Sequence, residues 1–175
     1  MRITSFLLTM AAAVSLTGCS TLISLHPFVT DQQAVFDTAL LGIWSDSHDD
    51  ELFIVRQDGK SYKIQHVKDT QSLSFSAQLF KVGDHRILDL VSTADDPFQL
   101  PVHTPMRIWV DGATLRFATL DSVWLKEKAR KQLAVQDVGE RALITAPGEA
   151  VLRFLINYGA AAEAFGKPDE LRKQQ

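Results

Sequence analysis

The only cysteine of this 175-residue chain is the residue best placed to do chemistry. Cys19 follows Leu16-Thr17-Gly18, and before these lies an apolar run, Phe6–Val14, with one positive charge, Arg2, ahead of it. A charged start, a short apolar stretch and small residues near its end are typical of a secretory signal. The pattern therefore predicts that residues 1–18 are a signal peptide and that the thiol of Cys19 is a lipid attachment point.

The segment Leu16-Thr17-Gly18-Cys19 resembles the lipobox of bacterial lipoproteins. The resemblance implies acylation of the sulfur, cleavage before Cys19 and acylation of the new amino group. Ser20, in place of aspartate, implies export to the periplasmic face of the outer membrane in a host that has one. A transmembrane anchor is the first alternative, but a span needs roughly 20 apolar residues. A free buried cysteine in a cytosolic protein is the second, and it leaves the residues before Cys19 unexplained.

Composition narrows the class of protein. Removal of residues 1–18 leaves 157 residues with 17 basic and 21 acidic side chains, a formal charge of −4. That length suits one domain with one core. The charge is too small to indicate a nucleic-acid partner, and the predicted lipid on Cys19 makes the membrane the expected partner. The sequence points to no particular protein partner.

Histidines and carboxylates offer a second kind of chemistry. His48, His66 and His103 fall near the same end of the predicted fold as Asp95-Asp96, and such side chains bind divalent metals. No His-x-x-x-His pair fixes a geometry, so we expect solvated turns and no metal or other cofactor. The chain also lacks a Gly-x-Ser-x-Gly elbow and a phosphate-binding glycine loop. We expect no enzyme, with a hydrolase built on a chance Ser–His pair as a remote alternative.

From Gly42 to Leu120 the chain is predicted to form strands. Leu73, Phe75, Ala77 and Leu79 alternate with polar residues, which is the period of a half-buried strand. Tight turns are indicated by glycine with aspartate, at 58–59, 83–84 and 111–112. The predicted strands are 42–47, 51–57, 60–67, 72–82, 86–93, 102–110, 113–120 and, after a helix, 141–146. Eight strands joined by hairpins predict an all-β fold, a closed up-and-down antiparallel barrel.

Three helices are expected beside these strands. Thr30 and Gln33 fit a capping box for a short N-terminal helix. A second helix covers 121–133, before the last strand, and a third follows Pro147 and packs on the barrel wall. The expected domain order is then a lipidated tether over 19–30, one barrel domain over 31–166, and a frayed polar tail over 167–175.

Gly42-Ile43-Trp44, at the start of the first strand, resembles the Gly-x-Trp signature of lipocalins and other calycins. The order of eight strands and a C-terminal helix is similar to theirs. The chain departs from the family in lacking a Thr-Asp-Tyr-like second motif and in the helix at 121–133. The resemblance implies a barrel that binds a small, largely apolar ligand.

Two functions remain open at this point. In the first, the barrel binds a lipid or similar molecule. In the second, it is packed solid and acts through its surface as an envelope assembly or inhibitor module, since eight strands suit either. The residues expected to line the interior are Tyr62, Ile64, His66, Phe75, Leu88, Leu90, Ile108 and Phe117. For His66 the alternative is a wall histidine satisfied by its neighbours.

The two ends of the predicted barrel differ. The tight turns and the N-terminal helix share one end, where Arg56 or Arg86 stacks on Trp44 or, alternatively, extends to water. The long connections share the other end, which is the expected mouth. There the loop from Ala94 to Thr104 carries Phe98 and Leu100 on an apolar underside and His103 at its hinge, and Phe98 and His103 are expected to join the ligand-lining residues. This loop is either a lid or a permanent plug.

Overall fold

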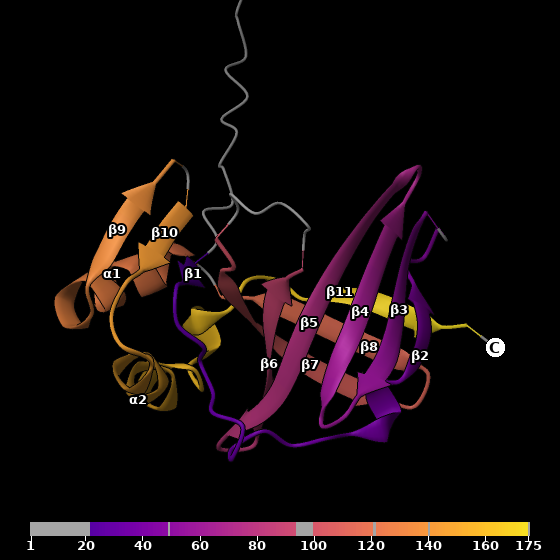
Figure 1. Cartoon of the computed structure of the whole chain (residues 1–175), viewed down its shortest axis with the longest axis horizontal. Helices are drawn as coiled ribbons and strands as arrows, with labels where there is room; N and C mark the ends of the chain where they lie inside the picture. Colours follow the sequence, from indigo (N-terminus) through magenta and orange to yellow (C-terminus); the bar gives the residue numbers. More distant parts are fainter. Residues whose placement is uncertain (1–21, 49, 94–99, 121, 140, 175) are drawn as a thin grey trace, which may run out of the picture.

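The computed structural model describes residues 22–48, 50–93, 100–120, 122–139 and 141–174, and Figure 1 shows a barrel with a smaller unit at its side. Eight strands form a closed antiparallel barrel, because each pairs with the next one in space, including β6 with β7, and the last strand, β11, pairs with the first, β2. This confirms the predicted all-β barrel of lipocalin-like layout with flanking helices. Its strands, in spatial order, are β2 (Gly42–Ser45), β3 (Glu51–Asp58), β4 (Ser61–Lys68), β5 (Gln71–Val82), β6 (His85–Ser92), β7 (His103–Asp111), β8 (Thr114–Thr119) and β11 (Asp169–Lys173).

The predicted hairpins form because their turn residues accept the required backbone. Gly59 and Gly112 have φ values of 63° and 56°, in the left-handed region that glycine enters without strain. These turns and the β5–β6 turn define the closed end of the barrel. The β2–β3, β4–β5 and β6–β7 connections lie at the other end, which we call the mouth. The three tight hairpin turns thus lie together at one end of the barrel and the long connections at the other, as the sequence predicted.

The eighth barrel strand is not the one predicted. Residues 141–144 form β10 (Arg141–Ile144), which pairs with β9 (Val135–Val138) and lies outside the barrel. The barrel is closed by β11, in the segment expected to be a frayed tail. Only Leu171 of this strand is buried, at 4% exposure, so its sequence carries almost no apolar alternation. The barrel domain therefore extends past residue 166, and the prediction of a polar tail over 167–175 is wrong.

The N-terminal region also departs from expectation. Leu22–Ser24 is a strand, β1, that pairs with β10 and with the start of β7, and Phe28 is fully buried. The described part of the predicted tether is therefore packed structure. Thr30 and Gln33 do bond through their side chains, but the chain turns only once there. The amide of Val35 instead donates to the carbonyl oxygen of Leu79, at 2.7 Å, so a single 3₁₀ turn, η1 (Thr38–Leu40), replaces the helix.

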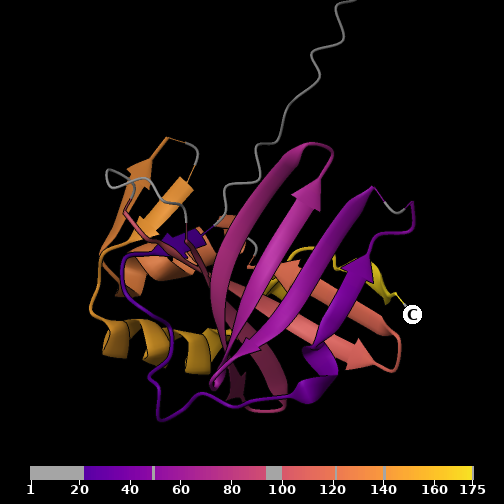
Figure 2. The ribbon, with the colours of Figure 1, turned by 45° about the vertical axis from the view of Figure 1, so that its right-hand side comes forward.

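The remaining elements pack against one side of the barrel, as Figures 1 and 2 both show. Helix α1 (Ser122–Gln132) confirms the predicted insertion, and α2 (Gly148–Tyr158) confirms the C-terminal helix. A second 3₁₀ turn, η2 (Ala162–Ala164), leads to β11. Val151, Phe154 and Leu155 of α2 join Phe80 and Ile87, on the outer face of the barrel, in one buried cluster. The barrel thus has an outer core on this side and a separate inner one. None of the described helices is long and apolar enough to cross a bilayer.

Candidate binding cavity

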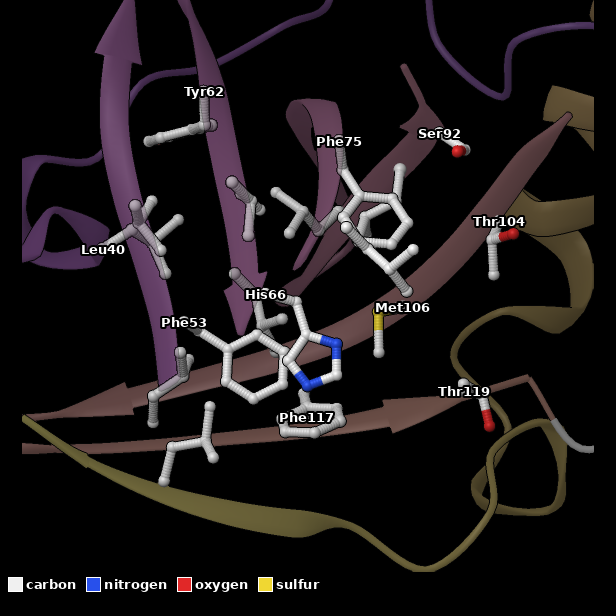
Figure 3. Close-up of a pocket in the computed structure, with 18 of the residues that line it drawn as sticks. Leu40, Phe53, Tyr62, His66, Phe75, Ser92, Thr104, Met106, Phe117 and Thr119 are labelled. Carbon is white, nitrogen blue, oxygen red and sulfur yellow. The ribbon is translucent and has the colours of Figure 1, made fainter. Parts of the chain in front are cut away.

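The inner core of the barrel surrounds a cavity of about 490 Å³. Its wall is mostly apolar and comes from every barrel strand except β2 (Figure 3). The apolar lining consists of Ile23, Leu40, Phe53, Val55, Ile64, Leu73, Phe75, Leu88, Leu90, Val102, Met106, Ile108, Leu115, Phe117 and Leu171, together with Tyr62. The barrel interior therefore contains open volume.

All eight residues expected inside the barrel line this cavity. They meet because side chains of paired strands that share a face lie opposite each other. Ile64 is opposite Phe75, and Ile108 is opposite Phe117. Alternation within each strand was enough to find them, since one face of a closed barrel must point inward.

Leu40 and Tyr62 form the floor of the cavity at the closed end. Trp44 and Tyr62 are fully buried; the indole Nε1 of Trp44 donates to the Leu40 carbonyl oxygen at 2.9 Å, and the Tyr62 hydroxyl accepts from the Asp37 amide at 2.7 Å. Burial raises the pKa of the Tyr62 phenol. These bonds hold η1 across the closed end, so the floor is a fixed surface.

Gly42 has a structural role beside this floor. Its φ is +134°, and a Cβ there would lie 2.8 Å from the side-chain Cε of Lys173. The Lys173 ammonium lies 5.1 Å from the centroid of the Trp44 ring. The cation against Trp44 is therefore Lys173, and neither predicted arginine fills that role. Arg86 pairs with Asp37 at 2.8 Å, while Arg56 is exposed because its neighbour Val55, and not Ile54, faces inward.

Polar groups gather at the mouth. In Figure 3 the labelled hydroxyl residues Ser92, Thr104 and Thr119 lie across the cavity from Leu40 and Tyr62. The cavity is thus apolar at its floor and carries hydrogen-bonding groups near its opening. That gradient suits a ligand with an apolar body and a polar end.

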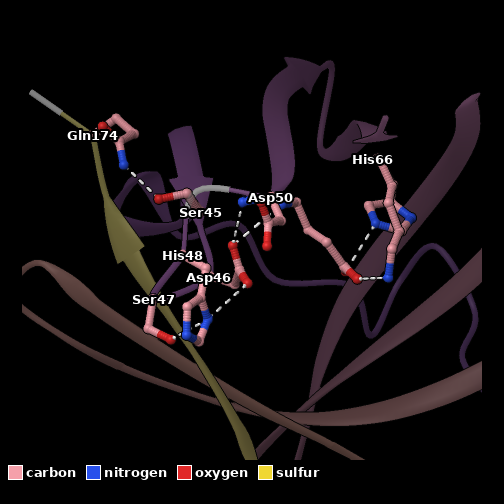
Figure 4. A network of polar contacts seen from close by, with 9 residues as sticks. Ser45, Asp46, Ser47, His48, Asp50, His66 and Gln174 are labelled. Atoms are coloured by element: carbon pink, nitrogen blue, oxygen red, sulfur yellow. Dashed lines mark hydrogen bonds and ion pairs between the residues drawn. The ribbon is translucent and has the colours of Figure 1, made fainter. Parts of the chain in front are cut away.

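His66 lies in the wall near the mouth. Its ring stacks on Phe53 with centroids 4.3 Å apart, and its Nε2 lies 3.1 Å from Oε2 of Glu51 (Figure 4). Lys68 bonds the other carboxylate oxygen of Glu51. The hydrogen bond from Lys68, aided by His66, holds the pKa of Glu51 below its ordinary value. His66 is therefore both a lining residue and a histidine satisfied by a neighbour.

Two other predicted histidines lie away from the cavity. Asp46 accepts hydrogen bonds from the amides of Asp50 and Glu51 and shapes the β2–β3 turn, where His48 is exposed (Figure 4). His103 is not a lining residue, because it alternates with Thr104 and faces outward. Its Nδ1 lies 2.9 Å from Oδ2 of the buried Asp89.

The predicted lid or plug can be placed only in part. Phe98 lies outside the described residues. Val102, at the end of the same loop, lines the cavity near the mouth. The loop therefore contributes to the opening, and its role there stays a prediction.

Two lining residues that the sequence did not predict come from the β1–β10 pair beside the barrel. Ile23 belongs to β1 and Arg141 to β10, and both reach the cavity because β1 pairs with the mouth end of β7. Arg141 is exposed and makes no ion pair with the described residues. It is the only arginine or lysine in the described lining, so it places one positive charge at the opening. Barrel periodicity contains no signal for either residue.

The described residues include no group of three histidine, cysteine, aspartate or glutamate side chains arranged to hold a metal ion. Comparison with family models, curated proteins and solved structures gives no match for the chain. The cavity itself is therefore the feature that bears on function.

Proposed function

We propose that this chain is a membrane-anchored envelope lipoprotein whose barrel binds a lipid or another small hydrophobic ligand. The observation that carries the proposal is the cavity of about 490 Å³ with an apolar wall. Pockets for small ligands commonly measure about 300–1,000 Å³ and have a few well-placed polar groups. The driving force for binding is the removal of apolar ligand surface from water, about 0.8 kcal/mol for each buried methylene.

Arg141 narrows the ligand class within this proposal. A guanidinium at the opening of an apolar cavity pairs well with a carboxylate or phosphate. The apolar body of an acidic amphiphile then lies between Phe75, Leu88 and Ile108, while its head group remains at the mouth. A fatty acid or a lipid with one acyl chain fits this description.

Ligand binding is tested by native mass spectrometry of the domain that begins at Ser20, with organic extraction of any co-purified molecule. This domain should fold, because both buried clusters consist of residues from Leu22 onward. We expect an adduct that extraction removes, and binding of the neutral fluorescent probe N-phenyl-1-naphthylamine by the extracted domain. Absence of both an adduct and probe binding would contradict the proposal.

The anchor is tested separately in cells fed alkyne-palmitate. The native chain should incorporate label, and Cys19→Ala should lose it and remain unprocessed. A matched control is Ser20→Ala, which keeps the thiol and should still be labelled. Labelling of Cys19→Ala at the native level would refute acylation at this residue.

A further inference from the structure

Exposed apolar side chains are concentrated around the mouth. Among the described residues, six large hydrophobic side chains are notably exposed, and two of them, Ile43 and Ile156, lie elsewhere. The other four are Leu73 at 52%, Leu100 at 71%, Val123 at 71% and Val138 at 52%. An apolar rim of this kind indicates a contact surface.

Each of these four residues is tied to the opening by the fold. Leu73 itself lines the cavity, and Leu100 lies two positions before the lining residue Val102. Val123 is the second residue of α1, which follows the mouth end of β8 in the chain. Val138 is paired with Arg141, whose side chain reaches the cavity. We call these four side chains the apolar rim.

The position of β1 fixes which end of the barrel is next to Cys19. Ile23 lines the cavity, and Ser24 pairs with His103 at the mouth end of β7. Three peptide links join Cys19 to Leu22, so their Cα atoms are at most about 11 Å apart. β1 also pairs in parallel with β10, with Leu22 opposite Ala142, so Leu22 lies next to Arg141 at the opening. The closed end of β7, Asp111, lies about 26 Å from His103, at roughly 3.3 Å per residue. A lipid on Cys19 is thus attached within about 11 Å of the β1–β10 pair at the opening.

We propose that the apolar rim rests on the bilayer, so that the cavity opens onto the membrane and exchanges its ligand directly with it. This inference rests on the proposed anchor at Cys19. The bilayer is then both the surface that covers the rim and the source of the ligand. An acyl chain then passes between the bilayer and the cavity without full exposure to water. The closed end faces away from the membrane.

Orientation can be measured with single fluorescent labels on the mature lipoprotein. Because its only native cysteine is acylated, one introduced cysteine is the only free thiol. Leu100→Cys and Val123→Cys place an environment-sensitive dye on the rim, and Lys60→Cys and Asp84→Cys place it on closed-end turns as matched controls. The proteins are reconstituted in phosphatidylethanolamine–phosphatidylglycerol vesicles that contain nitroxide-labelled lipid.

We expect the nitroxide lipid to quench both rim labels at least about twofold more than both closed-end labels, since side chains seated in the interface lie within the head-group layer. Equal quenching, or stronger quenching at the closed end, would overturn the proposal. Recovery of the protein with Cys19 as a free thiol and no vesicle association would overturn it as well.

A second variant separates the rim from the anchor. Leu100→Asp together with Val138→Asp should reduce quenching of the Val123→Cys label to the closed-end level, while acylation and vesicle association persist. Unchanged quenching in this variant means that the rim does not seat on the bilayer. Ligand binding is judged independently by native mass spectrometry, so a correct orientation with an empty cavity refutes only the binding function.

Discussion

Replacing Leu88 by tryptophan should stabilise the barrel and weaken ligand binding. Leu88 is 7% exposed and lines the cavity, so a larger side chain there enters empty space. If the indole buries roughly 60 Å² more apolar surface than leucine, at about 25 cal/mol per Å² the gain is about 1.5 kcal/mol. For a domain of this size that corresponds to a rise in Tm of about 3–6 °C.

Ile87→Trp is the matched control for this prediction. Ile87 is the adjacent residue on β6, is 1% exposed and points into the filled outer core with α2. Overpacking a filled core costs about 1–3 kcal/mol, so the Tm should fall by about 2–12 °C. Binding of the hydrophobic probe should persist, because the cavity wall is unchanged.

Calorimetry of the two variants, together with titration of N-phenyl-1-naphthylamine, checks both outcomes. Leu88→Trp should weaken probe binding at least tenfold, about 1.4 kcal/mol. If Leu88→Trp lowers the Tm as much as Ile87→Trp does and leaves probe binding intact, the interior has no free volume and the binding argument fails.

Three further perturbations test separate parts of the molecule. Leu171→Ala should lower the free energy of unfolding by about 2–3 kcal/mol if β11 closes the barrel. As a control, Arg172→Ala at an exposed position should change it by no more than about 0.5 kcal/mol. Equal effects of the two variants in urea denaturation would mean that the segment is not a barrel strand. Arg141→Gln should weaken palmitate binding about tenfold, which corresponds to the free energy of one charge-assisted hydrogen bond. Binding of the uncharged hexadecanol should be unchanged in competition titrations. Equal losses of affinity for both ligands would exclude a contact between Arg141 and the head group. The folded-state pKa of Glu51 is below its ordinary 4.5, so its stabilisation is present above that ordinary value and is lost as pH falls through the folded pKa. Glu51→Gln should therefore destabilise at pH 7 by about 0.2–1 kcal/mol and lose this effect as the pH falls below the folded pKa. A cost that does not diminish on acid titration would contradict the ion-pair explanation.

Much of the barrel could be predicted because its strands are specified locally. A strand with one face inward must alternate apolar and polar residues, and tight hairpins need glycine at a positive φ. Ile64, Phe75, Ile108 and Phe117 were therefore placed inside from alternation alone. The prediction of which β3 residues face inward was wrong, because Phe53, Ile54 and Val55 are all apolar and show no alternation.

The prediction of an N-terminal helix was wrong for a different reason. Thr30 and Gln33 form the expected side-chain contact, yet the amide of Val35 bonds to Leu79 in the barrel. A capping motif supplies only about 1 kcal/mol, which a tertiary hydrogen bond and the burial of Phe28 and Val29 can override. Local preference was present, and the packing of the chain against the barrel decided the outcome.

The sequence by itself determined the strands from Gly42 to Thr119 and, outside β3, the residues that face inward; the signal peptide and the acylation site at Cys19 stay predictions from the same source. Each of these depends on residue type and spacing within a short segment. Only the tertiary structure decided that β11 closes the barrel, that a cavity of about 490 Å³ remains, and that Ile23 and Arg141 reach its mouth. Strand partners and empty volume depend on contacts between distant segments, and no periodicity within one segment encodes them.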